Sequence, residues 1–173
     1  MNPFRAPLAV LVLGLALVGI AGVPADARAA ENPAFWKYQV KGDFPTVLKG
    51  LKRGLEAAQF ILTAEENLSK GLENNKHLFP GERWNTIGFD NVTAVHFCSV
   101  VFNQEVFNID MDWSVLCPFK AVVYTMKETP GEATVIVLRP TYLLARDPHK
   151  KAREIGRRIE ERIIGAIQEG LSY

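Results

Sequence analysis

Cysteine and histidine are scarce in this chain of 173 residues, which has two copies of the first and three of the second. The sequence also lacks a Gly-rich phosphate loop, a Gly-x-Ser-x-Gly nucleophile elbow and a His-Glu-x-x-His zinc motif. No Cys-x-x-Cys-His occurs, which excludes covalent c-type haem attachment through that motif, and the missing Cys-x-x-Cys argues against an oxidoreductase of the thioredoxin kind. These absences leave open whether the protein is an enzyme.

An excess of charge of either sign is also missing. The full chain has 20 basic and 19 acidic residues. Removal of a leader that contains Arg5, Asp26 and Arg28 leaves 18 of each. A balanced chain generates no field that would attract phosphates or anionic lipid, so we expect no nucleic-acid partner.

Residues 1–29 have the pattern of a cleavable secretory signal. An apolar run from about Leu8 to Val23 follows one positive charge, and Ala27-Arg28-Ala29 supplies the small residues that signal peptidases require. We expect cleavage between about Ala27 and Ala30, since the run only just approaches the length of an uncleaved membrane anchor. The mature chain is then periplasmic or secreted from a bacterium, with no stable anchor. Residues 30–173 suffice for one domain and are too few for two.

The periodicity predicts a helix near each end of that domain. Asp43 caps a helix from Phe44 to about Gln59, in which Gly50 and Gly54 are interpreted as small residues tolerated by packing. Asp147 caps a second helix from Lys150 to about Leu171. Its apolar face is predicted to contact the core, and its charged residues, among them Glu154, Glu160 and Glu161, to lie on a solvated outer face.

Strand patterns occupy most of the remaining chain. Lys37–Lys41, Phe60–Thr63 and Asn85–Phe89 are short runs of this kind, and Glu65–Leu72 favours a brief helix. Longer strands are predicted at the ranges 92–101, 116–127 and 132–139, with a turn at Asp90-Asn91 and a hairpin at 128–131. Strands flanked by helices are typical of an α+β fold with an antiparallel sheet, in the order β-α-β(4)-α.

The stretch from Thr93 to Tyr124 holds the residues best suited to chemistry. His96 and Cys98 lie two apart on a predicted strand and therefore point to one face, and Cys117 begins the next long strand. If these strands are antiparallel neighbours, the three side chains converge.

Three interpretations of the cluster stay open. Cys98 and Cys117 form a disulfide, closing an 18-residue loop for about 3 kcal/mol, or remain small buried groups near His96. Alternatively, His96 and two thiolates ligate copper, zinc or haem iron. In the third, one cysteine attacks a substrate sulfur, the other resolves the product, and His96 promotes thiolate formation.

The pattern His96-Phe-Cys98, followed by an apolar-Cys-Pro run and a Val-Val-Tyr strand, resembles the domain-of-unknown-function family 302 (DUF302) over roughly Lys37 to Leu171. The resemblance implies an α+β fold of TATA-binding-protein-like topology and homodimers. It implies no activity. The order Cys117-Pro118-Phe119-Lys120 departs from the family pattern, in which proline commonly precedes the second cysteine.

Our sequence-based hypothesis is thus a small exported binding module with His96, Cys98 and Cys117 as its candidate functional cluster or metal site. One alternative is a thiol-based redox or sulfur-transfer protein that uses the two cysteines. Another is a non-catalytic dimeric interaction protein with a structural disulfide, whose partner or small ligand the sequence does not identify.

Overall fold

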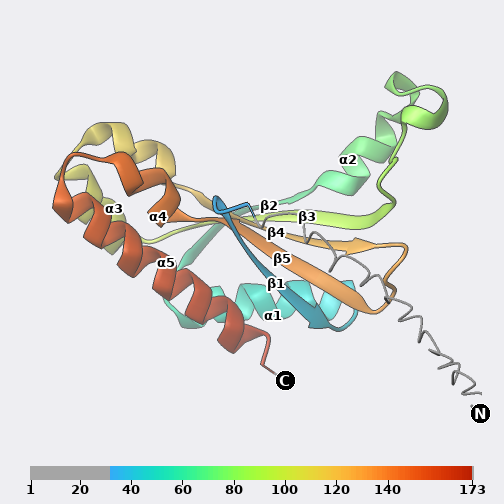
Figure 1. Ribbon diagram of the computed structural model, residues 1–173. Coiled ribbons are helices and arrows are strands. Elements are labelled where there is room, and N and C mark those ends of the chain that lie inside the picture. Colours follow the sequence, from blue (N-terminus) through green and yellow to red (C-terminus); the bar gives the residue numbers. More distant parts are fainter. Residues whose placement is uncertain (1–31, 173) are drawn as a thin grey trace, which may run out of the picture. The chain divides into compact units, whose positions relative to one another are not determined.

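The computed structural model describes residues 32–172 (Figure 1). The predicted signal, residues 1–29, lies outside the described residues. None of the helices in the described part is long and apolar enough to cross a membrane.

Five antiparallel strands form one sheet in the order β1-β5-β4-β3-β2. The strands are β1 (Phe35–Lys41), β2 (Ile61–Asn67), β3 (Phe89–Cys98), β4 (Phe119–Met126) and β5 (Glu132–Leu138). Strand β4 is central, and β1 and β2 form the two edges. The predicted α+β class with an antiparallel sheet is confirmed.

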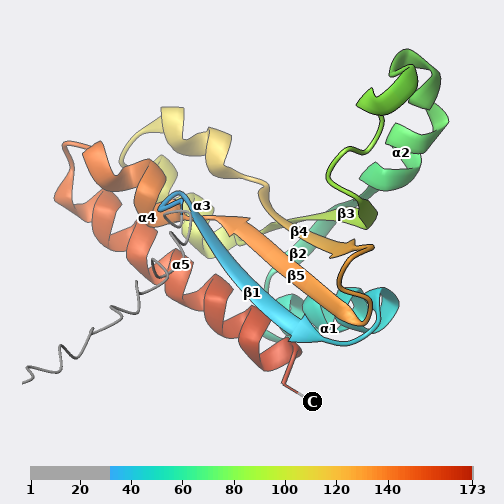
Figure 2. The ribbon, with the colours of Figure 1, turned by 45° about the vertical axis from the view of Figure 1, so that its right-hand side comes forward.

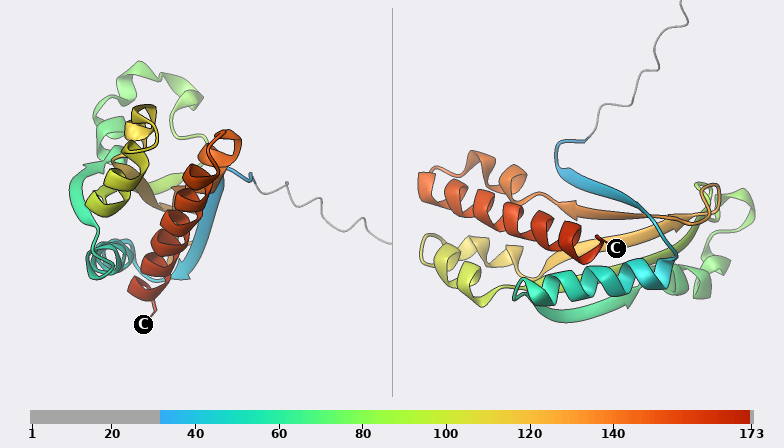
Figure 3. Two further views of the ribbon diagram at one scale, coloured as in Figure 1. Left: turned by 90° about the vertical axis from the view of Figure 1, so that its left-hand side faces the viewer. Right: turned by 90° about the horizontal axis from the view of Figure 1, so that it is seen from below.

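Two long helices, α1 (Phe44–Ala57) and α5 (Lys150–Gly170), cover the same face of the sheet, as the view from below shows (Figure 3). The shorter α2 (Leu68–Asn74) follows β2 and projects beyond the sheet, whereas α3 (Val100–Phe107) and α4 (Pro140–Leu143) gather at the other end (Figure 2). Short 3-10 turns complete the chain: η1 (Lys76–Leu78), η2 (Gly81–Arg83), η3 (Met111–Leu116) and η4 (Leu144–Arg146).

The core lies between the sheet and the two long helices. Alternate residues of the central strands point into it, among them Val95, Phe97 and Val123, and the predicted apolar face of α5 packs against them. Asp43 caps α1 as predicted, since its carboxylate accepts a hydrogen bond from the backbone N–H of Thr46 at 3.0 Å.

Glycines let the two long helices touch backbone to backbone. A Cβ placed on Gly54 would lie 2.1 Å from the carbonyl oxygen of Ala166, and one placed on Gly170 would lie 2.4 Å from that of Gly50. Both distances are far below van der Waals contact. The interpretation of Gly54 as merely tolerated was therefore wrong, because the close approach of α1 and α5 leaves no room for a Cβ at Gly54.

Glu160 also departs from its predicted place on the outer face of α5. Its carboxylate is only 7% exposed and accepts hydrogen bonds from Arg139 Nε at 2.8 Å and from the backbone N–H of Thr141 at 3.0 Å. These bonds attach α5 to the end of β5. The periodicity of α5 alone could not reveal the burial of Glu160, because both of its hydrogen-bond donors belong to another segment of the chain.

Three local predictions were wrong near the edges of the sheet. Glu65 and Glu66 extend strand β2 rather than starting a helix, which begins at Leu68. Residues 85–88 form a turn, and the predicted turn at Asp90-Asn91 is a register shift inside β3. Local propensity failed at these positions because pairing with the neighbouring strand decided the structure.

Candidate functional site

Strand β3 carries candidate groups at both of its ends. Val95 and Phe97 point into the core, so the alternation of the strand places His96 and Cys98 on the face opposite α1 and α5. The shared face was predicted. Beyond Cys98 the chain turns into α3, so the predicted continuation of the strand to Val101 was wrong.

At the carboxyl end of β3, Cys98 and Cys117 form a disulfide with their Cα atoms 5.9 Å apart. Cys117 caps η3 and is followed by a cis peptide bond to Pro118, and β4 begins only at Phe119. The predicted strand start at Leu116 was therefore wrong. The disulfide nonetheless joins the end of β3 to the segment just before β4, so the two cysteines converge as the sequence predicted.

One polar side chain contacts the disulfide. The amide Nδ2 of Asn103 in α3 donates a hydrogen bond to Cys117 Sγ at 3.1 Å, and both cysteines are half-buried. Sequence reasoning missed Asn103, since an asparagine fourteen residues from its partner leaves no periodic signal.

His96 turns toward the edge of the sheet. Its Nε2 lies 3.2 Å from the Glu66 Oε2 on β2, and the two side chains are 15% and 54% exposed. His96, Cys98 and Cys117 thus lie in one region of the sheet, but the imidazole of His96 contacts the carboxylate of Glu66.

The oxidised pair does not fit a copper, zinc or haem site. Disulfide sulfurs are not thiolates, and the thiolate is the form of cysteine that binds these metals. Among residues 32–172, no group of three or more histidine, cysteine, aspartate or glutamate side chains is arranged to hold a metal ion. A metal site at His96, Cys98 and Cys117 would first require reduction of the disulfide.

A second anchor holds the segment between the cysteines. The indole N–H of Trp113 in η3 donates to the carboxylate of Asp147, which is 3% exposed and also accepts from the backbone N–H of His149 at 2.7 Å. Burial of Asp147 opposes its ionisation, but the hydrogen bonds from His149 and Trp113 outweigh it and lower the pKa of the carboxyl. Asp147 was predicted to cap α5; the residue at the cap is His149.

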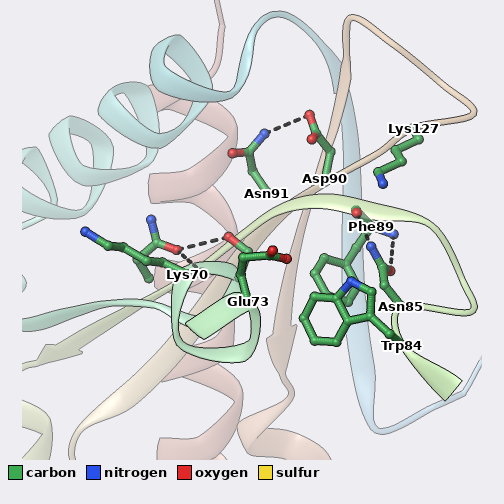
Figure 4. Close-up of a pocket in the computed structure, with 10 residues that line it drawn as sticks. Lys70, Glu73, Trp84, Asn85, Phe89, Asp90, Asn91 and Lys127 are labelled. Atoms are coloured by element: carbon green, nitrogen blue, oxygen red, sulfur yellow. Dashed lines mark hydrogen bonds between the residues drawn. The ribbon is translucent and has the colours of Figure 1, made fainter. Parts of the chain in front are cut away.

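The amino end of β3 borders a hollow of about 350 Å³ (Figure 4). Its walls come from α2, from the turn before β3, from β3 itself and from Lys127 after β4. The lining residues are Asn67, Ser69, Lys70, Glu73, Trp84, Asn85, Phe89, Asp90, Asn91 and Lys127.

Hydrogen bonds hold the walls of this hollow in place. Asn85 donates to the carbonyl of Phe89 at 2.7 Å and accepts from its N–H at 2.8 Å, which fixes the turn. Asn91 donates to Asp90 at 3.0 Å and to Thr125 at 3.2 Å. Sequence reasoning missed this site because its residue types are common, and only the concentration of asparagine, aspartate and aromatic residues between 84 and 91 could have indicated it.

Comparison with known proteins agrees with this architecture. No curated protein matches the chain. A solved structure described as an uncharacterized conserved protein DUF302 from Bacillus stearothermophilus matches with a TM-score of 0.66 at 16% identity, over 80% of this chain and 98% of the other. A likeness at this identity shows the fold alone. The family described as domain of unknown function DUF302 matches residues 36–170, nearly the whole described region. The chain therefore belongs to the DUF302 family.

Proposed function

We propose that this DUF302 protein is an exported, non-catalytic binding module that acts as a homodimer, and that its disulfide is structural. The supporting observation is one row of side chains on the sheet face opposite α1 and α5, which is apolar on the central strands and has opposite charges at the two edges.

Five residues that lie side by side across the five strands form this row. Registers place Lys37 beside Ile136, Ile136 beside Val122, Val122 beside Ala94, and Ala94 beside Glu66. Alternation assigns all five to the face away from the long helices, since their neighbours along each strand pack into the core or against α1. The row thus runs from an ammonium on β1, across the half-buried Ile136 and Val122 and the buried Ala94, to a carboxylate on β2.

Such a row is complementary to itself. A two-fold axis parallel to the strands, passing over β4, brings edge β1 of one copy onto edge β2 of the other. Lys37 of each copy then lies opposite Glu66 of the other copy, and the apolar residues in the middle of the two rows pack against each other. This is the isologous arrangement that two-fold dimers use, and the paired charges favour one orientation.

Sedimentation velocity of the mature protein over a range of concentrations tests the dimer. We expect Lys37→Glu to weaken association at least tenfold through like-charge contact with Glu66, and the double variant Lys37→Glu, Glu66→Lys to restore it. Lys49→Glu, on the exposed side of α1, is the matched control and should leave association unchanged. A wild-type monomer at all concentrations, or no recovery in the double variant, contradicts this use of the open face.

The contact between Asn103 and Cys117 favours a second candidate, thiol–disulfide exchange. An external thiolate attacks Cys98 Sγ and forms a mixed disulfide, while Cys117 leaves as a thiolate that the Asn103 amide stabilises. A second thiolate of the same external dithiol then attacks the external sulfur of the mixed disulfide, which releases Cys98 as a thiolate and leaves the external molecule as a disulfide, so the external dithiol supplies both electrons. Rapid exchange that slows at least tenfold in Asn103→Ala would support this candidate over a structural disulfide.

A further inference from the structure

The hollow at the amino end of β3 has a lining that neither the disulfide nor the open sheet face explains. We infer that it is a binding site for a small neutral saccharide of one or two rings. The inference rests on one aromatic wall, on the two carboxylates in the lining, of which Glu73 faces the wall, and on amides held by hydrogen bonds.

The aromatic wall is held rigidly. The ring of Trp84 lies 6.1 Å from that of Phe89 at 75°, and Phe79 packs on Trp84 at 6.3 Å. Trp84 stays only half-buried. A fixed indole beside an open hollow provides an apolar surface for the C–H face of a sugar ring, and its N–H is a donor for a hydroxyl.

One carboxylate lies across from this wall, and a second lines the hollow on the other side of β3. Figure 4 shows the carboxylate of Glu73 directed from α2 toward the rings, with Asp90 above them and the side chain of Lys70 running away. One oxygen of Glu73 forms an ion pair with the ammonium of Lys76 at 2.7 Å. One oxygen of Asp90 accepts a hydrogen bond from the side-chain amide of Asn91. Each carboxylate still has acceptor capacity for ligand hydroxyl groups.

The charge balance favours a neutral ligand. Lys76 offsets Glu73 through their ion pair, and Lys127 offsets Asp90 in the lining, so neither a cation nor an anion meets an excess of opposite charge. Neighbouring hydroxyls of a sugar can donate to a carboxylate and accept from an ammonium, which uses both kinds of group. The hollow lies near the lower end of the usual range of ligand-site volumes, about 300–1,000 Å³, which limits the occupant to one or two rings.

The amides make the site preorganised. Asn67 accepts hydrogen bonds from Ser69 and from the backbone of Lys70, and Ser69 in turn accepts from the N–H of Val92 at 3.2 Å. These bonds attach α2 to β3 across the base of the hollow. A ligand that enters meets walls that are already in place, which lowers the entropic cost of binding.

Isothermal titration calorimetry of the mature protein tests the site, with glucose, N-acetylglucosamine, maltose and cellobiose as neutral probes and choline, lysine and phosphate as charged ones. We expect saturable binding of at least one saccharide and of none of the charged probes. Sedimentation with insoluble peptidoglycan separates a cell-wall glycan from a free sugar as its source. Binding of none of the saccharides, or tighter binding of a charged probe, overturns the assignment.

Variants locate the binding. Trp84→Ala and Asp90→Asn should each weaken the saccharide at least tenfold, and Trp84→Phe, which keeps a ring, should weaken it less. Glu128→Gln, an exposed carboxylate in the β4–β5 hairpin, is the matched control and should bind normally. Unchanged affinity in folded Trp84→Ala and Asp90→Asn, with folding checked by circular dichroism, places the binding elsewhere and contradicts the inference.

Discussion

A disulfide joins the carboxyl end of strand β3 to Cys117, whereas the amino end of β3 borders a hollow whose walls are held by noncovalent contacts. The first end has the rare residues, with Cys98 and Cys117 joined and Asn103 beside them. The second end has common residues with carboxylates and an indole facing open space. The rarest residues of this chain thus form a covalent bond at one end of β3, whereas the polar groups that we propose for ligand binding lie at the opposite end of the same strand.

Removal of the disulfide is expected to have the largest effect. The double variant Cys98→Ala, Cys117→Ala should lower the free energy of unfolding by about 3 kcal/mol, since the bond closes a loop of 18 residues. Urea titration with and without reductant measures this. Reductant should destabilise the wild type and leave the variant unaffected, and saccharide affinity at the other end should not change. A double variant as stable as the wild type would show that the disulfide does not stabilise the fold.

The Trp113 anchor should have the next largest effect. Trp113→Phe keeps an aromatic ring but removes the N–H that the buried Asp147 carboxylate accepts, at a cost of about 2 kcal/mol. Trp84→Phe, in the hollow, is the matched control and should cost less than about 1 kcal/mol, because in the described part of the chain no buried group accepts a hydrogen bond from its N–H. Equal losses in the two variants, measured by thermal and urea unfolding, would remove the distinction between the two ends.

Acid should weaken the disulfide end through Asp147. Because its pKa in the folded protein lies below the ordinary value of about 3.9, the unfolded chain binds the proton more tightly. The carboxylate therefore stabilises the fold above about pH 4, and this contribution is lost as the pH falls through the folded pKa. The stability advantage of the wild type over Asp147→Asn should shrink as the pH falls below about 4. A difference independent of pH would contradict the role of the charge.

His96 should have the smallest effect. Its partner Glu66 is half exposed, and exposed ion pairs contribute at most about 1 kcal/mol. His96→Ala should therefore leave unfolding nearly unchanged, and Glu66→Gln should match it. A large loss of stability, or a bound metal in the purified wild type that disappears in His96→Ala, would restore the metal site that the sequence suggested.

The sequence predicted the parts of this fold that depend on periodicity. The existence of strands β3, β4 and β5, though not all of their ends, and the helices that begin at Phe44 and Lys150 follow from patterns of apolar residues, as does the common face of His96 and Cys98. It failed where a distant segment decides the environment. Glu160 is buried because Arg139 and Thr141 reach it, and Gly54 is needed because Ala166 lies against it.

The candidate sites divide in the same way. The cysteines attracted attention because they are rare. Their convergence could be predicted because they lie at the adjoining ends of two strands that were expected to pair. The hollow combines α2, a turn, β3 and the end of β4, and its residues come together only in the folded chain. A single sequence contains no signal that relates Glu73 to Trp84 or to Lys127.

Thiol trapping tests the central claim, that the cysteine pair is structural, most directly. Cells that export the protein are quenched with acid, free thiols are alkylated, and the intact mass is measured without reduction. We predict that the chain carries no alkyl group at steady state and is two hydrogen atoms lighter than its reduced form. A substantial alkylated fraction, or a mixed disulfide with another thiol, would show that the pair cycles and would contradict the account.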